Sequence, residues 1–310
     1  MEKGCTQNVT NCNASKFFEG MKQNITPCLW FDDNAKEAAE LYTSVFPGSE
    51  IKNISFFGKE GFETHQQEEG KVLTVNFTLC ALPFTILNGG PMYKLNPSVS
   101  LYVACEKAED VDFLYSKLAD GGMVMMPLGS YKWSERYAWI SDRFGVSWQI
   151  ALDVVTSQKI TPAFLFMGNH HPQSDQAIEF YTSVFPGSSI GSILRYAGGG
   201  SEPEGSVQHA QFSLNGNSFM IMGNSMQHAF DFTEAFSFQV FCDSQEEIDY
   251  FWDRLREGGS EQQCGWLKDR FGLSWQIVPS VLEELLKDPL RAGKATEAFL
   301  KMKKFILADL

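Results

Sequence analysis

The strongest constraint on the fold of this chain is an internal repeat. The segment YTSVFPGS occurs at residues 42–49 and again at 181–188, and DRFGVSWQI at 142–150 recurs as DRFGLSWQI at 269–277. The two matches have different offsets, so loops of unequal length separate the matching segments. A repeat this long corresponds to a whole domain and not to one unit of a solenoid. The sequence therefore predicts a domain made twice.

Each repeat shows the same succession of periodic segments twice over. Alternating or β-branched runs indicate strands, and apolar residues spaced by three or four positions indicate helices. In the first repeat these segments lie at 25–31, 34–46, 51–57, 72–79, 84–87, 98–105, 108–119 and 136–152. In the second they lie at 160–166, 175–185, 207–214, 219–222, 236–242 and 245–256. We therefore expect an α+β fold of two tandem domains, each built from two βαβββ modules.

The repeat also divides the chain into four parts. Residues 1–20 are polar and aperiodic, and we expect a disordered extension there. The two domains are expected at 21–155 and 156–280. Residues 281–310 contain an apolar stripe among basic residues and predict one or two helices that pack against the domains, with partner or membrane binding as the alternative.

Composition excludes several partners and compartments. The 310 residues carry a formal net charge of −13, whereas binders of nucleic acid or anionic membranes need a basic face. No apolar run approaches the roughly 18 residues of a membrane span, and no signal-peptide pattern is present. The seven cysteines form no CxxC pair and no zinc-type cluster. We expect a cytoplasmic protein that binds neither membrane nor nucleic acid.

The repeated segments carry a family resemblance. They read LYTSVFPGS from Leu41, FYTSVFPGS from Phe180, LNGGP from Leu87, SFQVFC from Ser237 and CGWLKDRFGLSWQIVP from Cys264, with a departure at Tyr137-Ala138-Trp139. This pattern resembles the vicinal oxygen chelate superfamily, in particular its PhnB-like branch, whose members are often labelled demethylubiquinone methyltransferase-like. The resemblance covers roughly Asn24 to Pro279. It implies that the two modules of each domain form a curled eight-stranded cup that holds a small ligand or metal, and that the two domains form an internal pseudo-dimer. Further homo-oligomers stay open.

The resemblance also supplies positions for a metal, one near each of the first, fourth, fifth and eighth strands of a domain. The eighth-strand acid of relatives aligns with Gln149 and Gln276, and the fifth-strand histidine with Ser100 and Ser237. The first-strand position falls near Pro27 and Pro162, and the fourth strands offer no carboxylate or imidazole. Divalent metals need such ligands in number. We therefore expect no glyoxalase-type metal and no other cofactor.

Several side chains remain as ligand-binding candidates. Alternation along a strand places Gln149 and Gln276 on the face opposite the large apolar residues, hence toward the cup. Trp139 and Trp266 precede the repeated DRFG turn at the same spacing and are candidates for a pocket wall, although core packing is the alternative. The candidate ligand-binding residues are Gln149, Ser100, Trp139, Gln276, Ser237 and Trp266.

Histidine suggests a second function. His209 lies inside a repeated strand, opposite Thr74 in the other copy, and an imidazole can act as general base or as a satisfied strand residue. His170 and His171 lie in an inserted loop, where we expect solvation and no metal. No glycine-rich turn opens a helix as a Rossmann-type methyltransferase requires. The leading hypothesis is a metal-free binder of a small, partly apolar molecule. The alternatives are a lyase, isomerase or dioxygenase-like enzyme around His209, or a protein whose cups have become filled cores.

Overall fold

The computed structural model describes residues 25–155, 158–288 and 290–310. The predicted N-terminal extension lies outside these residues. The first repeat comprises β1 (Ile25–Phe31), α2 (Ala35–Val45), β2 (Glu50–Phe56), α3 (Phe62–His65), β3 (Val72–Leu79), β4 (Leu82–Asn88), β5 (Val99–Cys105), α4 (Ala108–Leu118), β6 (Met123–Tyr131), β7 (Ser134–Ser141) and β8 (Ser147–Leu152). It therefore contains the two expected modules, with one additional short helix, α3.

The second repeat has the same order of strands and long helices, with a short 3-10 helix, η1, added and no counterpart of α3 among the described residues. It comprises β9 (Ile160–Met167), η1 (Gly168–Gln173), α5 (Ser174–Val184), β10 (Ser189–Arg195), β11 (Val207–Leu214), β12 (Asn217–Asn224), β13 (Phe236–Cys242), α6 (Gln245–Arg256), β14 (Ser260–Glu261), β15 (Trp266–Lys268) and β16 (Ser274–Pro279). The C-terminal tail forms α7 (Val281–Lys287), α8 (Ala292–Phe299) and η2 (Leu307–Asp309). In the described part of the chain, no helix combines the length and apolarity that crossing a bilayer would require.

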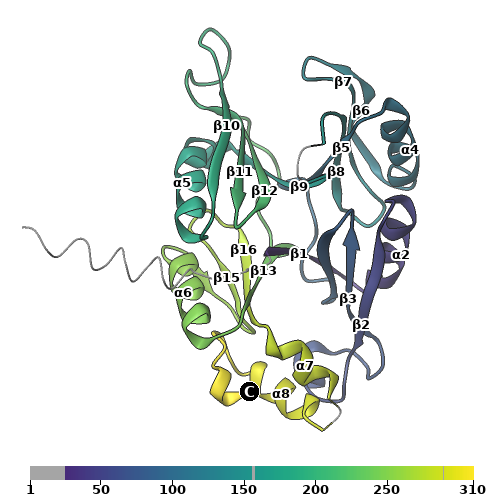
Figure 1. Ribbon diagram of the computed structural model, residues 1–310, viewed down its shortest axis with the longest axis vertical. Helices are drawn as coiled ribbons and strands as arrows, with labels where there is room; N and C mark the ends of the chain where they lie inside the picture. The colour runs from purple at the N-terminus through teal and green to yellow at the C-terminus, as the bar shows by residue number, and fades with distance from the viewer. Residues whose placement is uncertain (1–24, 156–157, 289) are drawn as a thin grey trace, which may run out of the picture.

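The strands form two eight-stranded mixed sheets, which confirms the predicted fold class. Each sheet joins modules from different repeats. The lower sheet of Figure 1 has the order β14-β15-β16-β13-β1-β4-β3-β2, and the upper sheet has the order β10-β11-β12-β9-β5-β8-β7-β6. The joints are antiparallel pairs of β1 with β13 and of β5 with β9. Neither repeat therefore builds an eight-stranded sheet from its own strands alone.

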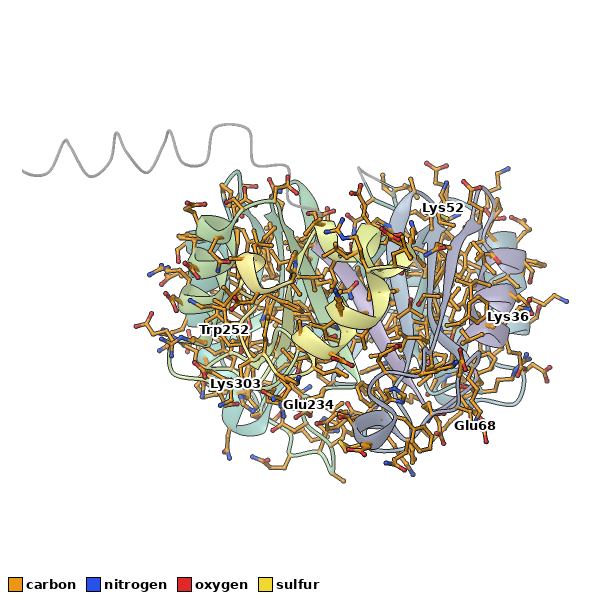
Figure 2. All side chains as sticks on the ribbon, turned by 90° about the horizontal axis from the view of Figure 1, so that it is seen from below. Lys36, Lys52, Glu68, Glu234, Trp252 and Lys303 are labelled. Atoms are coloured by element: carbon orange, nitrogen blue, oxygen red, sulfur yellow. The ribbon has the colours of Figure 1, made fainter. Side chains whose placement is uncertain are left out.

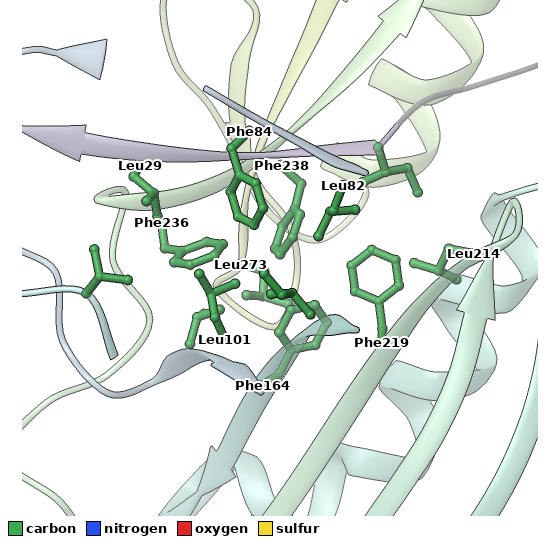
Figure 3. Packing of buried hydrophobic residues seen from close by; sticks show 14 of the residues in the cluster. Leu29, Leu82, Phe84, Leu101, Phe164, Leu214, Phe219, Phe236, Phe238 and Leu273 are labelled. Atoms are coloured by element: carbon green, nitrogen blue, oxygen red, sulfur yellow. The ribbon is translucent and has the colours of Figure 1, made fainter. Parts of the chain in front are cut away.

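The two sheets pack back to back through aromatic side chains. Phe238 of the lower sheet lies 5.5 Å from Phe164 and 5.6 Å from Phe219 of the upper sheet, measured between ring centroids. Phe84 and Leu101 join this core in Figure 3. Because alternate residues of a strand face opposite ways, the neighbours of these core residues point outward. We call these outward faces the upper cup and the lower cup.

Buried aspartates tie each repeat across the two sheets. Asp142, in the turn before β8, accepts hydrogen bonds from Tyr42 of α2 at 2.7 Å and from the Trp148 indole at 2.8 Å. Asp269 accepts the matching bonds from Tyr181 and Trp275, both at 2.8 Å. The repeated YTSVF and DRFG segments are therefore partners in space, and this contact explains why both copies keep the two segments.

The C-terminal tail spans the two flanks of the lower cup. On one flank, the Cys264 and Gly265 N–H groups donate to the carbonyls of Met302 and Lys303 at 2.8 and 2.7 Å. On the other flank, a Cβ added to Gly61 would collide with Leu300. Figure 2, seen from below, shows the tail helices between the two halves of the sheet. The expected packing of the tail against the domains is thus found, and it covers the lower cup.

Candidate ligand-binding cups

The upper cup contains a buried polar row centred on Gln149. Its amide nitrogen donates to Ser100 Oγ at 2.6 Å and lies 3.4 Å from Met222 Sδ, while its carbonyl oxygen accepts from the Tyr137 hydroxyl at 2.7 Å. Ser100 and Gln149 are almost fully buried. Met222 comes from the second repeat and the other three from the first, so the row crosses the joint between the repeats.

Trp139 lies beside this row. It is the cross-strand neighbour of Gln149, is half-buried, and donates its indole N–H to Ser147 Oγ at 2.8 Å. The sequence-predicted set Gln149, Ser100 and Trp139 is thus assembled on one face. Trp139 is the member of this set with exposed surface.

His209 belongs to the same cup, on the wall contributed by the second repeat. It is the cross-strand neighbour of Met222. Burial lowers the pKa of the His209 imidazole, and the nearby negative charge of Asp153 offsets only part of this effect. Asp153 accepts a 2.7 Å hydrogen bond from the Tyr102 hydroxyl, and Tyr102 also faces this cup. The candidate histidine and the candidate glutamine are therefore on facing walls of one site, although they come from different repeats.

The lower cup holds the pseudo-symmetric row around Gln276. Its amide donates to Ser237 Oγ at 2.8 Å, and its carbonyl oxygen accepts from Gln239 Nε2 at 3.2 Å. Thr85 continues the row by donating to Gln239 Oε1 at 2.8 Å. Burial raises the pKa of the adjacent Cys28 thiol to about 11, so the thiol is neutral at pH 7. Hydrogen-bonding groups in this row therefore satisfy one another.

Trp266 is the cross-strand neighbour of Gln276, as Trp139 is of Gln149. Its ring meets Trp30 edge-on at 6.0 Å, and the Trp30 indole donates to the Gly90 carbonyl at 2.7 Å. Nearby, Glu234 pairs with Lys268 at 3.0 Å. Burial alone would raise the pKa of the Glu234 carboxyl, but the hydrogen bond from Lys268 opposes it, and the pKa is lowered overall. The C-terminal tail is anchored on both flanks of this cup.

The metal positions implied by the resemblance carry neutral, mutually bonded groups. The Gln149 amide donates a hydrogen bond to the Ser100 hydroxyl, and the Gln276 amide donates one to the Ser237 hydroxyl. Among the described residues, no three His, Cys, Asp or Glu side chains lie close enough to hold a metal ion. An uncharged amide and hydroxyl already bonded to each other do not fit a glyoxalase-type divalent cation.

The assignment of the first-strand position to prolines was wrong. Pro27 pairs with core residue Phe238, whereas Cys28 pairs with Ser237, which faces the cup. Because strand side chains alternate, Thr26 and Cys28 face the lower cup, and Thr161 and Ala163 face the upper one. This correction adds no carboxylate or imidazole to either cup.

The expectation that His171 is solvated was also wrong. The side chain is 2% exposed, and its Nε2 lies 3.1 Å from the Val207 carbonyl oxygen. In the first repeat Asn88 Nδ2 donates to the matching Val72 carbonyl at 3.0 Å. Gly223 takes the place of Asn88, and a Cβ there would lie 2.7 Å from the His171 ring. His171 therefore fills the space that Asn88 fills in the other copy.

Comparison with known proteins identifies the family. The model of the family described as 3-demethylubiquinone-9 3-methyltransferase matches residues 23–151 and again residues 158–278. The chain belongs to this family. As a tandem PhnB-like member, it carries one family domain per repeat, in agreement with the duplication seen in the sequence. Among curated proteins, no match is found.

Two solved structures are similar to this PhnB-like chain over different spans. A PhnB protein from Bacillus cereus is 39% identical over 42% of this chain and 98% of its own length, with a TM-score of 0.38. Glyoxalase I from Zea mays is 10% identical over 84% of this chain and 93% of its own length, with a TM-score of 0.54. The second likeness shows that the four-module fold is shared.

The sequence analysis did not predict four of the cup-facing residues of this PhnB-like chain, and these fall into two groups. Tyr102 and Tyr137 lie two positions from Ser100 and Trp139, so strand alternation alone could have found them. Met222 meets Gln149, and Gln239 meets Thr85, across the joint between repeats. No local sequence signal indicates contacts of this second kind.

Proposed function

We propose that the upper cup binds a small, partly apolar organic molecule. The observation that carries this proposal is the difference between two pseudo-symmetric cups. The tail packs on both flanks of the lower cup, whereas its described residues make no such contacts at the upper cup, where half-buried Trp139 lies beside the polar row. An apolar wall with a few fixed polar groups is the usual composition of a small-molecule site.

The polar row would orient the guest. Gln149 is held from three sides, so its amide plane is fixed before a ligand arrives. A preorganised wall loses little conformational entropy on binding. The neutral donor set favours binding or sequestration without a metal. Stoichiometric divalent metal in protein purified without chelator would overturn that part of the proposal.

Two matched tryptophan variants test which cup binds. The full chain is screened against metabolites and antibiotics by saturation-transfer NMR and native mass spectrometry. We expect Trp139→Ala to weaken binding of any hit at least tenfold and Trp266→Ala to leave it within twofold. The reverse order would place the site in the lower cup and contradict the proposal, as would hits unaffected by either change.

A second candidate function is catalysis around His209. Its lowered pKa keeps the imidazole neutral at pH 7, so it could accept a proton from a guest held between the walls. If so, His209→Gln abolishes turnover of a bound molecule while binding persists, and the wild-type rate falls as pH drops below the ordinary histidine range. Turnover unchanged in the variant would exclude this function.

A further inference from the structure

A long hairpin distinguishes the first repeat from the second. Twenty-one positions separate Gly121 from Asp142, but eleven separate the matching Gly258 from Asp269. The extra residues extend β6 and β7, and Lys132 and Trp133 form the turn between them. The hairpin rises at the rim of the upper cup in Figure 1. The lower cup has no counterpart among the described residues, because β14 and β15 are two and three residues long.

The tip of this hairpin carries three aromatic rings in mutual contact. Tyr131 and Trp133 stack with centroids 5.2 Å apart and planes at 23°. Both meet Tyr137 edge-on, at 5.5 and 5.6 Å. Trp133 is 62% exposed, an unfavourable position for the largest apolar side chain unless something covers it. Tyr137 also donates to Gln149, so the cluster continues into the polar row.

Carboxylates surround the open side of the cluster. A cavity of about 640 Å³ lies between the hairpin tip and the end of β8. Tyr131 and Trp133 line this cavity. Its charged lining residues are Glu106, Glu135, Asp153 and Lys132, so three acidic side chains face one basic side chain. Asp153 holds Tyr102 of the upper cup, which connects this cavity to the proposed site.

We infer that this cavity is a subsite for an organic cation, a quaternary or alkylated ammonium group on the molecule bound in the upper cup. The faces of aromatic rings attract cations, with the strongest attraction over tryptophan. Nearby carboxylates add long-range attraction without requiring an N–H donor. The inference rests on the proposed function for the body of the ligand, but the cation subsite can be measured alone.

Choline and its neutral isostere 3,3-dimethylbutan-1-ol are the probes. Each is titrated into the ¹⁵N-labelled full chain, and the amide signals of residues 131–135 and of Leu152 are followed. We expect saturable shifts with choline, affinity at least tenfold weaker for the isostere, and weakening of choline binding as salt rises. Trp133→Ala should weaken choline at least tenfold, and the pair Glu106→Gln with Glu135→Gln about fivefold.

Exposed residues elsewhere provide matched controls. Phe56, on β2, is 57% exposed, and Glu68 is also exposed and lies at the lower sheet in Figure 2. Phe56→Ala and Glu68→Gln should leave choline affinity within twofold. Equal binding of choline and its isostere, or choline affinity unchanged in Trp133→Ala, would overturn the cation subsite. Either result leaves the cup proposal to the separate Trp139 and Trp266 comparison.

Discussion

At the scale of single residues, the family resemblance indicated the glutamine and serine positions, and alternation along the strand indicated which way the glutamines face. Gln149, Ser100 and Trp139 lie together as expected, and so do Gln276, Ser237 and Trp266. The histidines were harder to place. The inserted turn has a polar sequence. The His171 side chain is nevertheless buried, because Gly223, more than fifty positions away, has no side chain and leaves room for the ring. Such compensation has no local signal.

Removing the His171 ring should therefore destabilise the fold. We expect His171→Ala to lower the free energy of unfolding by about 2–4 kcal/mol, because it leaves a cavity and an unpaired Val207 carbonyl. His228→Ala, at an exposed position, should change it by less than about 0.5 kcal/mol. Chemical denaturation measures both. Equal effects would mean that His171 does not fill this space.

The buried aspartates should make stability depend on pH. Burial raises the pKa of Asp269 to about 6, above its ordinary value of 3.8. The folded state therefore holds this proton more tightly than the unfolded chain, and the contribution of Asp269 is complete below pH 3.8 and lost as pH rises through about 6. The loss is roughly 3 kcal/mol. Asp269→Asn should remove this part of the pH dependence in urea unfolding, whereas exposed Asp253→Asn should retain it.

At the scale of elements, the positions of most strands and helices follow from the sequence, but their pairing does not. Strand β1, which is the edge strand of its own module, could pair with β5 of its own repeat or with β13 of the other. Duplication gives β5 and β13 nearly the same pattern of buried residues, with a difference only between Ala104 and Phe241, so the sequence does not distinguish the two arrangements. The tail was predicted to pack, but the face that it covers depends on this same pairing.

The tail should detach as a unit when its anchor is removed. Phe305 is 2% exposed, and its ring lies against Gly265. We expect Phe305→Ala to increase hydrogen exchange across residues 290–310 and to make Trp266 more accessible to acrylamide, while the sheets stay protected. Ile306→Ala, at a solvent-exposed neighbour, serves as control. Unchanged exchange in Phe305→Ala would show that the tail is held elsewhere.

At the scale of the whole molecule, each repeat is an incomplete unit that contributes half of both sheets. Its two modules are joined to each other by Tyr42 with Asp142, or by Tyr181 with Asp269, while their strand edges require the other repeat. The antiparallel joints supply that partner. Exposed strand edges without a partner pair readily with other chains.

Two separate fragments should therefore reassemble. Residues 21–155 and 156–310, produced together, are expected to form a one-to-one complex with the circular dichroism spectrum of the intact chain. Either fragment alone should form homodimers or aggregates, which size-exclusion chromatography with light scattering detects. A stable monomer of either fragment would contradict the pairing of β1 with β13 and of β5 with β9.

The joining of unlike halves also affects how such a protein can evolve. In a symmetric dimer of single repeats, one codon change would alter both cups at once, because two-fold symmetry makes them identical. In the fused chain, the same change alters one cup and leaves its twin untouched. The long aromatic hairpin over one cup and the tail across the other are differences that only a covalently joined, asymmetric pair can inherit.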